Sequence, residues 1–494
     1  MVFAPGYLHP VTKQDRILRP ESRAPHGDAA EHSADNRAGS KPFTAKIVVG
    51  DPEHAGASLV VLGDNERAMQ QLLDEGLTAA VDLVYVDPPF NTGRVFDTFD
   101  GRQGYSDIWP SERVFLFFLR TRLRLVKELM SQRGSFYLHI DRKVGYRARV
   151  VIDRTIGRDH FRNEITRVKC NPKNSAREAY GNTTDVIYFY SHPDAIWNDV
   201  REPLTDDQIR SQYTKVDAET GRRYTTSPLY APGVVKNGPT GGPWRGMSPP
   251  PGKHWSRPPA ELDELDRQGR IEWSATGNPR RKLYADESSG TKLQDVWVFK
   301  DKGGSRDRYP TEKNLELLER VVQQSSAPGS IVLDCFMGSG TTLVAAAKHG
   351  RRFIGIDESR TSLAETLHRL THETDASFTV IAPEPLVVDF AAAEFDLQRD
   401  RDSVRVRIRN HACGAAVRAA LLAHRDDSGV WNAVPLRETA GAFAGRVVDR
   451  QHTHLLVVDA DGRITAAPLA PVPAAAPRKA HMRRARKRVA ALAA

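Results

Sequence analysis

The sequence predicts an α/β fold built on a mostly parallel β-sheet. Short apolar runs alternate with amphipathic stretches, the strand–helix–strand rhythm of such sheets. We predict a strand over residues 58–64, a helix over 65–76 that ends at Gly76, and a buried strand over 81–87. The same rhythm returns after residue 314, so two separated parts of the chain are expected to build one sheet.

The other core elements follow from the same periodicities. The expected helices are 111–130, 143–156 and 314–326, and the expected strands are 135–141, 185–192, 331–334 and 351–357. Between the two halves, residues 227–259 mix glycine, proline, tryptophan and basic residues without a helical period, which indicates a loop-rich insertion.

The chain has 494 residues, which is longer than one hydrophobic core usually supports. Structure is expected to begin at Leu59, after a disordered arm rich in proline, glycine and charge. We divide the chain into an arm (1–55), a first core half (56–200), an insertion (201–292), a second core half (293–372), a small β-rich appendage (375–470) and a basic tail (471–494).

The composition of the chain indicates which partners, cofactors and cellular compartment to expect. The formal charge of +9 and the isoelectric point near 9.4 suit a polyanionic partner. The three cysteines, Cys170, Cys335 and Cys413, are widely spaced, which argues against a disulfide framework and against a structural zinc site. Neither a secretory signal nor an apolar run of about 18 residues is found, so we expect a cytoplasmic protein that does not associate with membranes and holds no metal.

A glycine turn follows the strand expected at 331–334. Phe336, Gly338 and Gly340 form an FxGxG pattern after Asp334, and such a turn lets a ligand approach backbone N–H groups at the start of a helix. A P-loop is excluded because Thr341 rather than lysine follows the last glycine, and the third glycine of the dinucleotide fingerprint is missing. The remaining form suits a ligand with an amino-acid end.

The next strand ends in Asp357, close to the spacing at which an acidic residue reaches ribose hydroxyls in dinucleotide-binding folds. The turn and this carboxylate together predict an adenosyl ligand. An ordinary strand-to-helix connection is the alternative for the glycine turn taken by itself.

A second turn, Asp87-Pro88-Pro89-Phe90, follows the buried strand at 81–87. The carboxyl ends of parallel strands are where ligands bind in open α/β sheets. The Asp87 carboxylate and the Pro88 carbonyl could accept hydrogen bonds from both protons of a base amino group, which would make its nitrogen more reactive. Phe90 would stack on a base flipped out of a duplex. The alternative is a proline turn that merely ends a strand.

Together these motifs resemble the DNA amino-methyltransferases, specifically the β group, in which the catalytic motif precedes the cofactor motif. The resemblance covers residues 58–370 and extends to type III modification subunits and their solitary relatives. It implies a Rossmann-like methyltransferase sheet with S-adenosylmethionine as cofactor. Its motifs assign catalysis to Asp87, Pro88, Pro89 and Phe90, and cofactor binding to Asp64, Asp87, Thr311, Lys313, Asp334, Phe336, Gly338, Gly340, Thr341 and Asp357.

The same residues limit which atom of a base could be methylated. Methylation at cytosine C5 needs a thiolate from a Pro-Cys pair, and none of the three cysteines follows a proline. Direct transfer to an amino nitrogen remains. In the resembling family, aspartate in first place is typical of adenine N6, so we favour adenine and keep cytosine N4 as the alternative. Phe90 departs from the commoner tyrosine.

Double-stranded DNA is the expected partner, and the protein is expected at the nucleoid. Basic and aromatic residues alternate in the insertion, where they could contact phosphates and bases. They are Arg222, Arg223, Tyr224, Lys236, Trp244, Arg245, Lys253, Trp255, Arg257, Trp273, Arg280, Arg281 and Lys282. The basic tail would add salt-sensitive affinity, or serve solubility alone. A restriction subunit and a homodimer are left open as partners.

Two other classes of function compete with DNA methylation by this chain. One is a DNA-specificity subunit of a restriction complex that keeps the fold without turnover, against which the intact Asp87 and glycines argue. The other is a methyltransferase acting on protein or RNA, against which the motif order and the large insertion argue.

Overall fold

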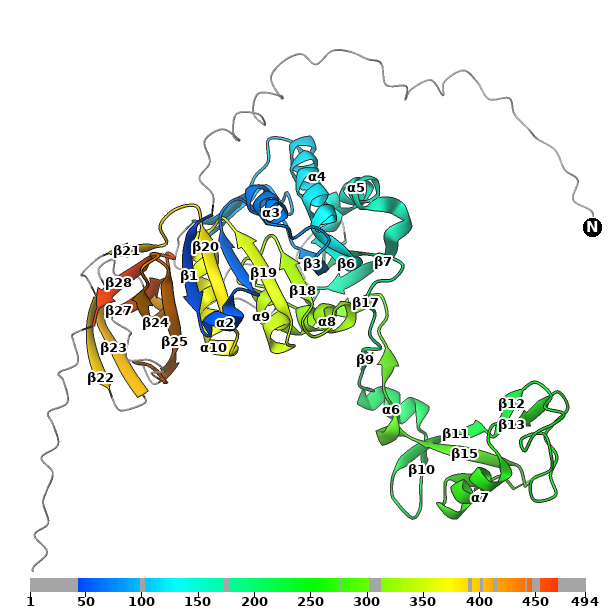
Figure 1. The fold of residues 1–494 in the computed structure, drawn as a ribbon. Coiled ribbons are helices and arrows are strands. Elements are labelled where there is room, and N and C mark those ends of the chain that lie inside the picture. The colour runs from blue at the N-terminus through cyan, green and yellow to red at the C-terminus, as the bar shows by residue number, and fades with distance from the viewer. Residues whose placement is uncertain are drawn as a thin grey trace, which may run out of the picture.

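The computed structural model describes residues 43–97, 103–172, 178, 180–275, 277–301, 312–389, 393–399, 403–411, 416–439, 442–446 and 454–469. Figure 1 shows a helix-covered central sheet, a lobe formed by the insertion, and a β-rich C-terminal unit beside the opposite edge of the sheet. Thr311, Cys413 and the basic tail 471–494 lie outside the described residues, as does most of the predicted arm. Within the described ranges, no helix is both long and apolar enough to cross a bilayer.

The central sheet is largely parallel. From one edge to the other its strands are β17 (Val296–Val298), β7 (Phe161–Val168), β8 (Thr184–Ser191), β6 (Met130–Ile140), β3 (Val81–Val86), β18 (Ile331–Asp334), β19 (Arg352–Asp357), β2 (Leu59–Leu62), β20 (Phe378–Ala382) and β1 (Ala45–Val49). The run from β6 to β20 is parallel throughout, whereas β8 runs antiparallel to both of its neighbours and β1 runs antiparallel to β20. The α/β class predicted from the sequence is confirmed.

The centre of the sheet joins the two halves of the chain. β3 and β18 pair in parallel, with Leu83 opposite Val332 and Val84 opposite Leu333. From β18 the chain passes through a helix to β19 on one side, and from β3 it passes through a helix to β6 on the other. The connections therefore leave in opposite directions, and the carboxyl ends of β3 and β18 border the crevice that such a switch point opens.

Helices cover both faces of this sheet. One face carries α8 (Leu315–Ser325), α9 (Thr341–Lys348) and α10 (Arg360–Glu373). The other carries α3 (Asn65–Asp74), α4 (Glu112–Leu129) and α5 (Arg142–Ile152). Along β18, Val332 packs into the first layer and Leu333 into the second. Successive side chains of a strand point to opposite faces of the sheet, and both faces are covered by helices. The side chains on both faces must therefore be apolar, which explains the uninterrupted apolar runs in the sequence.

The start and the end of the core differ from the expectation. The structure begins before Leu59, with β1 and α2 (Pro52–Ala55), because β1 pairs with β20 and with a C-terminal strand far away in the sequence. A five-residue strand gives little local signal for such pairing. The predicted appendage, residues 375–470, included β20. This strand pairs with β2 and therefore belongs to the central sheet.

The insertion forms a lobe with its own small core. Its two connections to the central sheet pair with each other as β9 (Arg201–Glu202) and β16 (Thr291–Lys292). The lobe contains a four-stranded sheet, a hairpin and two helices: β10 (Lys215–Val216), β11 (Arg223–Pro228), β15 (Pro279–Tyr284), β14 (Ile271–Trp273), β12 (Tyr230–Pro232), β13 (Lys253–Trp255), α6 (Asp206–Gln212) and α7 (Pro259–Arg267). Within residues 227–259 regular structure is confined to the end of β11, β12, β13 and the first residue of α7, so the loop-rich interpretation of that stretch is confirmed. The other strands and helices of the lobe lie outside it.

Two tryptophans of the insertion form its core instead of an exposed surface. Trp244 and Trp255 are 2% and 1% exposed and pack with Leu229, Leu262 and Ile271. Their N–H groups donate to the Asp263 carboxylate and the Gly242 carbonyl, which satisfies the polar end of each ring. The expectation that these rings enter a DNA groove is therefore wrong. The same holds for Tyr224, which is 8% exposed, whereas Trp273 is 39% exposed.

The C-terminal unit is made of strands. Its described strands are β21 (Val387–Asp389), β22 (Ala393–Arg399), β23 (Ser403–His411), β24 (Val417–Arg425), β25 (Trp431–Thr439), β26 (Ala442–Arg446), β27 (His454–Asp459) and β28 (Ile464–Pro468). The hairpin expected to turn at DADG is present as β27 and β28. β25 pairs in parallel with β1, which joins this unit to the edge of the central sheet.

The buried tryptophan of the lobe provides a test of this packing. Replacing Trp255 with alanine should destabilise the lobe by about 3–5 kcal/mol because it leaves a large cavity. Limited proteolysis should then cut within residues 201–292 well before it cuts the central sheet. Trp273→Ala is the control, since that ring is partly exposed, and should change the cleavage rate little. Equal protease resistance of W255A and the unmodified protein would contradict this core.

Candidate active site at the carboxyl ends of β3 and β18

The turn after β3 is held by a buried carboxylate. Asp107, at the end of β5 (Gln103–Asp107), accepts hydrogen bonds from the backbone N–H groups of Phe90 at 3.2 Å, Asn91 at 2.8 Å and Thr92 at 2.8 Å. It also accepts one from the Thr92 hydroxyl at 2.7 Å. Successive N–H groups pointing at one anion form a backbone nest, and Asn91 takes the left-handed conformation this requires, with φ of 55°. Asp107 therefore fixes the direction in which Asp87 to Phe90 leave the sheet.

Asp87 is held on one side only. Its Oδ2 forms an ion pair with the Lys313 ammonium, which also lies 5.4 Å from the centre of the Phe90 ring. Its Oδ1 is buried and accepts no hydrogen bond from any described residue. A buried carboxylate oxygen without a donor is costly, so this oxygen has the capacity to accept a further hydrogen bond.

The glycine turn after β18 is shaped by Asp334. This carboxylate accepts hydrogen bonds from the Phe336 N–H at 3.0 Å and from the Thr342 hydroxyl at 2.5 Å. Gly338 and Gly340 both have positive φ, 51° and 72°. At Gly340 a Cβ would lie 2.7 Å from the Thr366 hydroxyl oxygen, so both conformation and space require glycine there.

Asp357 joins the next strand to the same turn. Its carboxylate accepts hydrogen bonds from the Gly338 N–H at 3.0 Å and from the Ser359 N–H at 2.9 Å. Burial raises the pKa of Asp334 to about 7 and that of Asp357 to about 6. Near neutral pH both carboxyl groups are therefore poised to ionise, and a cationic ligand nearby would favour the ionised form.

A second layer of polar contacts supports the pocket from α3 and α4. Asn65 donates to the Cys335 carbonyl at 2.7 Å, and Arg122 donates to the Asn65 side-chain oxygen at 2.8 Å. Arg122 also pairs with Asp64 at 3.1 Å, so Asp64 and the glycine turn are held by one connected network. The Asp64 carboxylate caps α3 by accepting from the Arg67 N–H at 3.0 Å.

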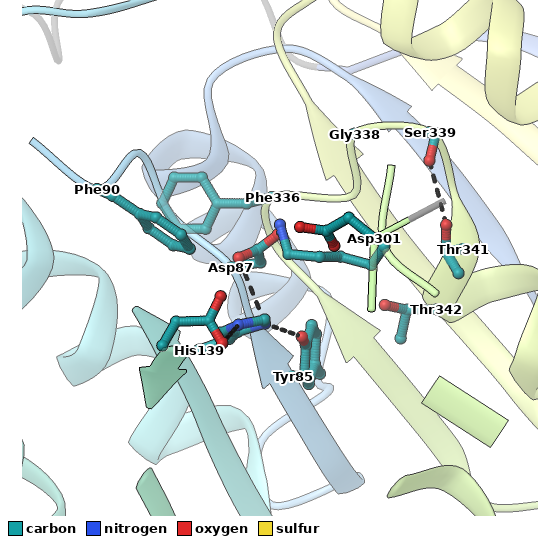
Figure 2. Close-up of polar contacts among 12 residues, drawn as sticks. Tyr85, Asp87, Phe90, His139, Asp301, Phe336, Gly338, Ser339, Thr341 and Thr342 are labelled. Atoms are coloured by element: carbon teal, nitrogen blue, oxygen red, sulfur yellow. Dashed lines mark hydrogen bonds and ion pairs between the residues drawn. The ribbon is translucent and has the colours of Figure 1, made fainter. Parts of the chain in front are cut away.

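The two turns line one cavity of about 710 Å³. Figure 2 shows Asp87 and Phe90 on one side and the strand of the glycine turn, with Gly338, on the other. The predicted site residues that line this cavity are Asp64, Asp87, Pro88, Pro89, Phe90, Lys313, Asp334, Phe336, Gly338, Thr341 and Asp357. Gly340 shapes the turn from behind, and Thr311 lies outside the described residues. Pockets of this size bind metabolite-sized ligands.

Sequence reasoning missed several residues of the site. Asn65, Asp107, Trp109 and Phe118 line the cavity, and His139 lies directly behind Asp87. Asn65 follows the predicted Asp64 and could have been included as the first residue of a helix. Asp107 and His139 approach through tertiary packing, and no spacing in the sequence connects either of them to Asp87.

The family model for DNA methylases matches residues 81–366, which contain both turns. The chain belongs to this DNA methylase family. It is 40% identical over 304 residues to the type II methyltransferase M.EcaI of Enterobacter cloacae, a match that covers 60% of this chain and 66% of that relative. It is 25% identical over 360 residues to the StyLTI Mod subunit, from a type III restriction-modification enzyme of Salmonella typhimurium, covering 63% and 53% of the two chains.

Solved structures give a weaker likeness. The structural alignment with the crystal structure of the M1.HpyAVI–SAM complex covers 63% of this chain and 98% of that chain, with 16% sequence identity and a TM-score of 0.35. At that score the likeness adds nothing to the family assignment, which rests on sequence.

The residues of the cavity fit S-adenosylmethionine, the cofactor that the sequence motifs predict. Asp334 and Asp357 can accept from its ammonium or hydroxyl groups, Phe336 offers an apolar face, and the turn exposes backbone to the ligand. The described residues contain no cluster of three or more metal-ligating side chains.

The nest around Asp107 provides a test of how the catalytic turn is held. Replacing Asp107 with alanine removes the acceptor of five hydrogen bonds, the fifth from the Trp109 indole N–H, so the turn should shift and methyl transfer should slow by about 100-fold. Cofactor affinity should change less than about threefold, because the glycine turn is untouched. The exposed carboxylate in Asp74→Asn serves as control. A wild-type rate in D107A would show that the nest does not position the turn.

Proposed function

We propose that this methylase transfers a methyl group from S-adenosylmethionine to the N6 amino group of adenine in duplex DNA, at a specific sequence. One observation carries the proposal: Asp87, which has a buried carboxylate oxygen without a donor, lines the same cavity as the glycine turn. A base amino group supplies the missing donor, and the cofactor lies within reach of it. The reaction then needs no covalent enzyme intermediate.

The chain's residues would act on the target amine as follows. The Asp87 carboxylate and the Pro88 carbonyl accept its two hydrogen bonds, which localises the nitrogen lone pair. Phe90 stacks on the flipped base. In this structure Lys313 donates to the other carboxylate oxygen of Asp87, Oδ2, and its ammonium lies 5.4 Å from the centre of the Phe90 ring.

The cofactor would lie along the glycine turn. The sulfonium supplies an electrophilic methyl group. We assign Asp334, Phe336, Gly338 and Thr341 to its amino-acid end and Asp357 to its ribose. Asp64 borders the same cavity from α3, and Arg122 fixes its orientation.

The lobe would read DNA, although through fewer residues than the sequence suggested. Arg222, Arg245 and Lys282 are engaged with carboxylates of the lobe itself, which leaves them less free to bind phosphates. Arg223, Lys236 and Lys253 are exposed and are our candidates for phosphate contacts. A restriction partner, suggested by the Mod subunit among the relatives, stays a prediction, as do a homodimer and a cytoplasmic location at the nucleoid.

The proposed reaction is tested by methyl incorporation into unmethylated plasmid DNA. Asp87→Ala should lower incorporation at least 100-fold, since it removes the acceptor that activates the amine. Asp82→Asn, which changes a carboxylate near the other end of β3, is the control. Nucleoside analysis of the product should give N6-methyladenine. N4-methylcytosine would correct the base, and undiminished incorporation in D87A would refute the catalytic assignment.

The buried carboxyl groups predict a pH dependence of cofactor binding. Folding raises the pKa of Asp334 to about 7 and of Asp357 to about 6 through burial, so both are largely protonated at pH 5.5. Raising the pH to 8 ionises both, and the cationic cofactor should then bind more tightly. Titration calorimetry should show a weaker pH dependence for Asp334→Asn and for Asp357→Asn. A flat profile for the unmodified protein would contradict these assignments.

A further inference from the structure

A buried arginine lies behind the glycine turn. Arg369, on α10, is 5% exposed. Its Nη1 donates hydrogen bonds to the Thr341 hydroxyl at 2.6 Å and to the carbonyl and hydroxyl oxygens of Ser339 at 3.3 Å each. Ser339 and Thr341 both line the cavity, and Figure 2 shows their hydroxyl groups facing each other at the end of the turn. Arg369 therefore contacts the cavity wall from behind.

The guanidinium is fixed from its own helix. Its Nε donates to the Glu373 carboxylate at 2.8 Å, one turn further along α10. Burial of a charged group is costly unless anions and hydrogen-bond acceptors compensate it, and both are present here. Because the guanidinium is planar, the bond from Nε sets the direction in which Nη1 points. The hydrogen bonds to the turn are therefore held in one geometry.

The same guanidinium faces the segment that carries Lys313. Nη1 of Arg369 lies 3.6 Å from Oε1 of Glu312, which is within ion-pair distance. Glu312 immediately precedes Lys313, and the Lys313 ammonium pairs with Oδ2 of Asp87. The other oxygen of Asp87, Oδ1, has no donor in the described part of the chain. One guanidinium thus contacts both the turn assigned to the cofactor and the segment that orients the catalytic carboxylate.

Helix α10 carries this arginine on the side that faces the glycine turn. Ser362, Thr366 and Arg369 follow an i, i+4, i+7 spacing, so they lie on one side of the helix. The hydroxyl groups of Ser362 and Thr366 donate to the Gly338 carbonyl at 2.5 and 3.3 Å. Three side chains of one helix therefore bond to successive residues of the turn.

The C-terminal β unit supports α10 from another side. Nδ1 of His368 lies 2.7 Å from the Arg418 carbonyl oxygen, and the Glu438 N–H donates to Nε2 of His372 at 3.1 Å. Apolar residues of α10 and of β24 also share one core. These contacts fix the helix in place, so Arg369 projects from a rigid support.

We propose that Arg369 is a positioning residue for methyl transfer, which holds the glycine turn and the segment of Glu312 and Lys313 in one fixed arrangement. The inference rests on the proposed function and deepens it. Transfer to nitrogen requires the methyl group and the target amine to meet within a narrow range of distance and direction. The turn would hold the methyl donor, and Lys313 orients the Asp87 carboxylate that would hold the amine. The Arg369 guanidinium links these two supports.

Arg369→Lys in the full chain tests this link. A lysine keeps the charge but lacks the planar group that joins the turn to two carboxylates. The variant should raise the dissociation constant of S-adenosylmethionine at least about fivefold in titration calorimetry. Single-turnover methyl transfer to plasmid DNA should slow at least about tenfold at saturating cofactor. Arg351→Lys is the control, because this half-buried arginine makes comparable hydrogen bonds at the amino end of β19.

Glu312→Ala tests the second contact of Arg369 separately. The turn keeps its bonds to Arg369, so cofactor affinity should change less than about threefold. Methyl transfer should slow about tenfold, because the segment of Lys313 loses its anchor. A loss of stability alone would not separate rate from affinity in this way. Glu316→Ala, which removes an exposed carboxylate on α8, is the control. The double variant R369K/E312A should be no slower than R369K, since both changes break the same link.

Single-variant rates equal to those of the controls would overturn the inference while leaving the proposed function intact. So would losses in the two single variants that multiply in the double variant. Absence of methyl transfer in the unmodified protein would refute the function itself, and cofactor affinity then decides: an unchanged dissociation constant in R369K overturns the inference. If R369K does not fold, as judged by circular dichroism, E312A decides, and a rate equal to that of E316A overturns the inference.

Discussion

The parallel pairing of β3 with β18 is the constraint on which the rest of this site depends. It places two turns that are about 250 residues apart in the chain at one edge of one sheet. A slip of one residue would exchange the two side-chain layers and would move Asp87 relative to the glycine turn. The apolar side chains on both faces of these strands specify the register, so the packing of the core also sets the geometry of the site.

The site concentrates buried carboxylates, and each has a distinct environment. Asp107 is surrounded by backbone N–H groups and Asp185 by cations and His139, whereas Asp334 and Asp357 each accept from two donors and form no ion pair with a cation of the described residues. Burial of an ionised carboxylate is costly unless donors or cations compensate it. The first two are thus fixed structural anions, whereas the last two and Asp87 have capacity left for ligands. This difference distinguishes the carboxylates that stabilise the shape of the site from those that can bind a ligand.

Local patterns in the sequence were sufficient to predict the main strands and helices and both turns. The turns were recognisable because their special backbone residues, two prolines and two glycines, are adjacent in the sequence, and the apolar runs gave the strands. That both turns line one cavity followed from the rule that parallel strands share a carboxyl edge.

What could not be predicted depends on contacts between distant segments. Asp107 and His139 reach Asp87 from β5 and β6, and β1 joins the sheet through β20 and β25. The tryptophans of the insertion were predicted to bind DNA because the insertion mixes aromatic and basic residues, as DNA-binding loops do. Only the packing of Leu229 and Leu262 around Trp244 and Trp255 shows that they are core.

The most direct measurement is a crystal structure of the full chain with a methyl-inert cofactor analogue and duplex DNA that contains the methylated sequence. The target amino nitrogen should lie within hydrogen-bond distance of an Asp87 oxygen and about 3–3.5 Å from the atom that replaces the methyl carbon, with the analogue along residues 334–340. A cofactor analogue bound away from the glycine turn, or a base that does not approach Asp87, would contradict the account.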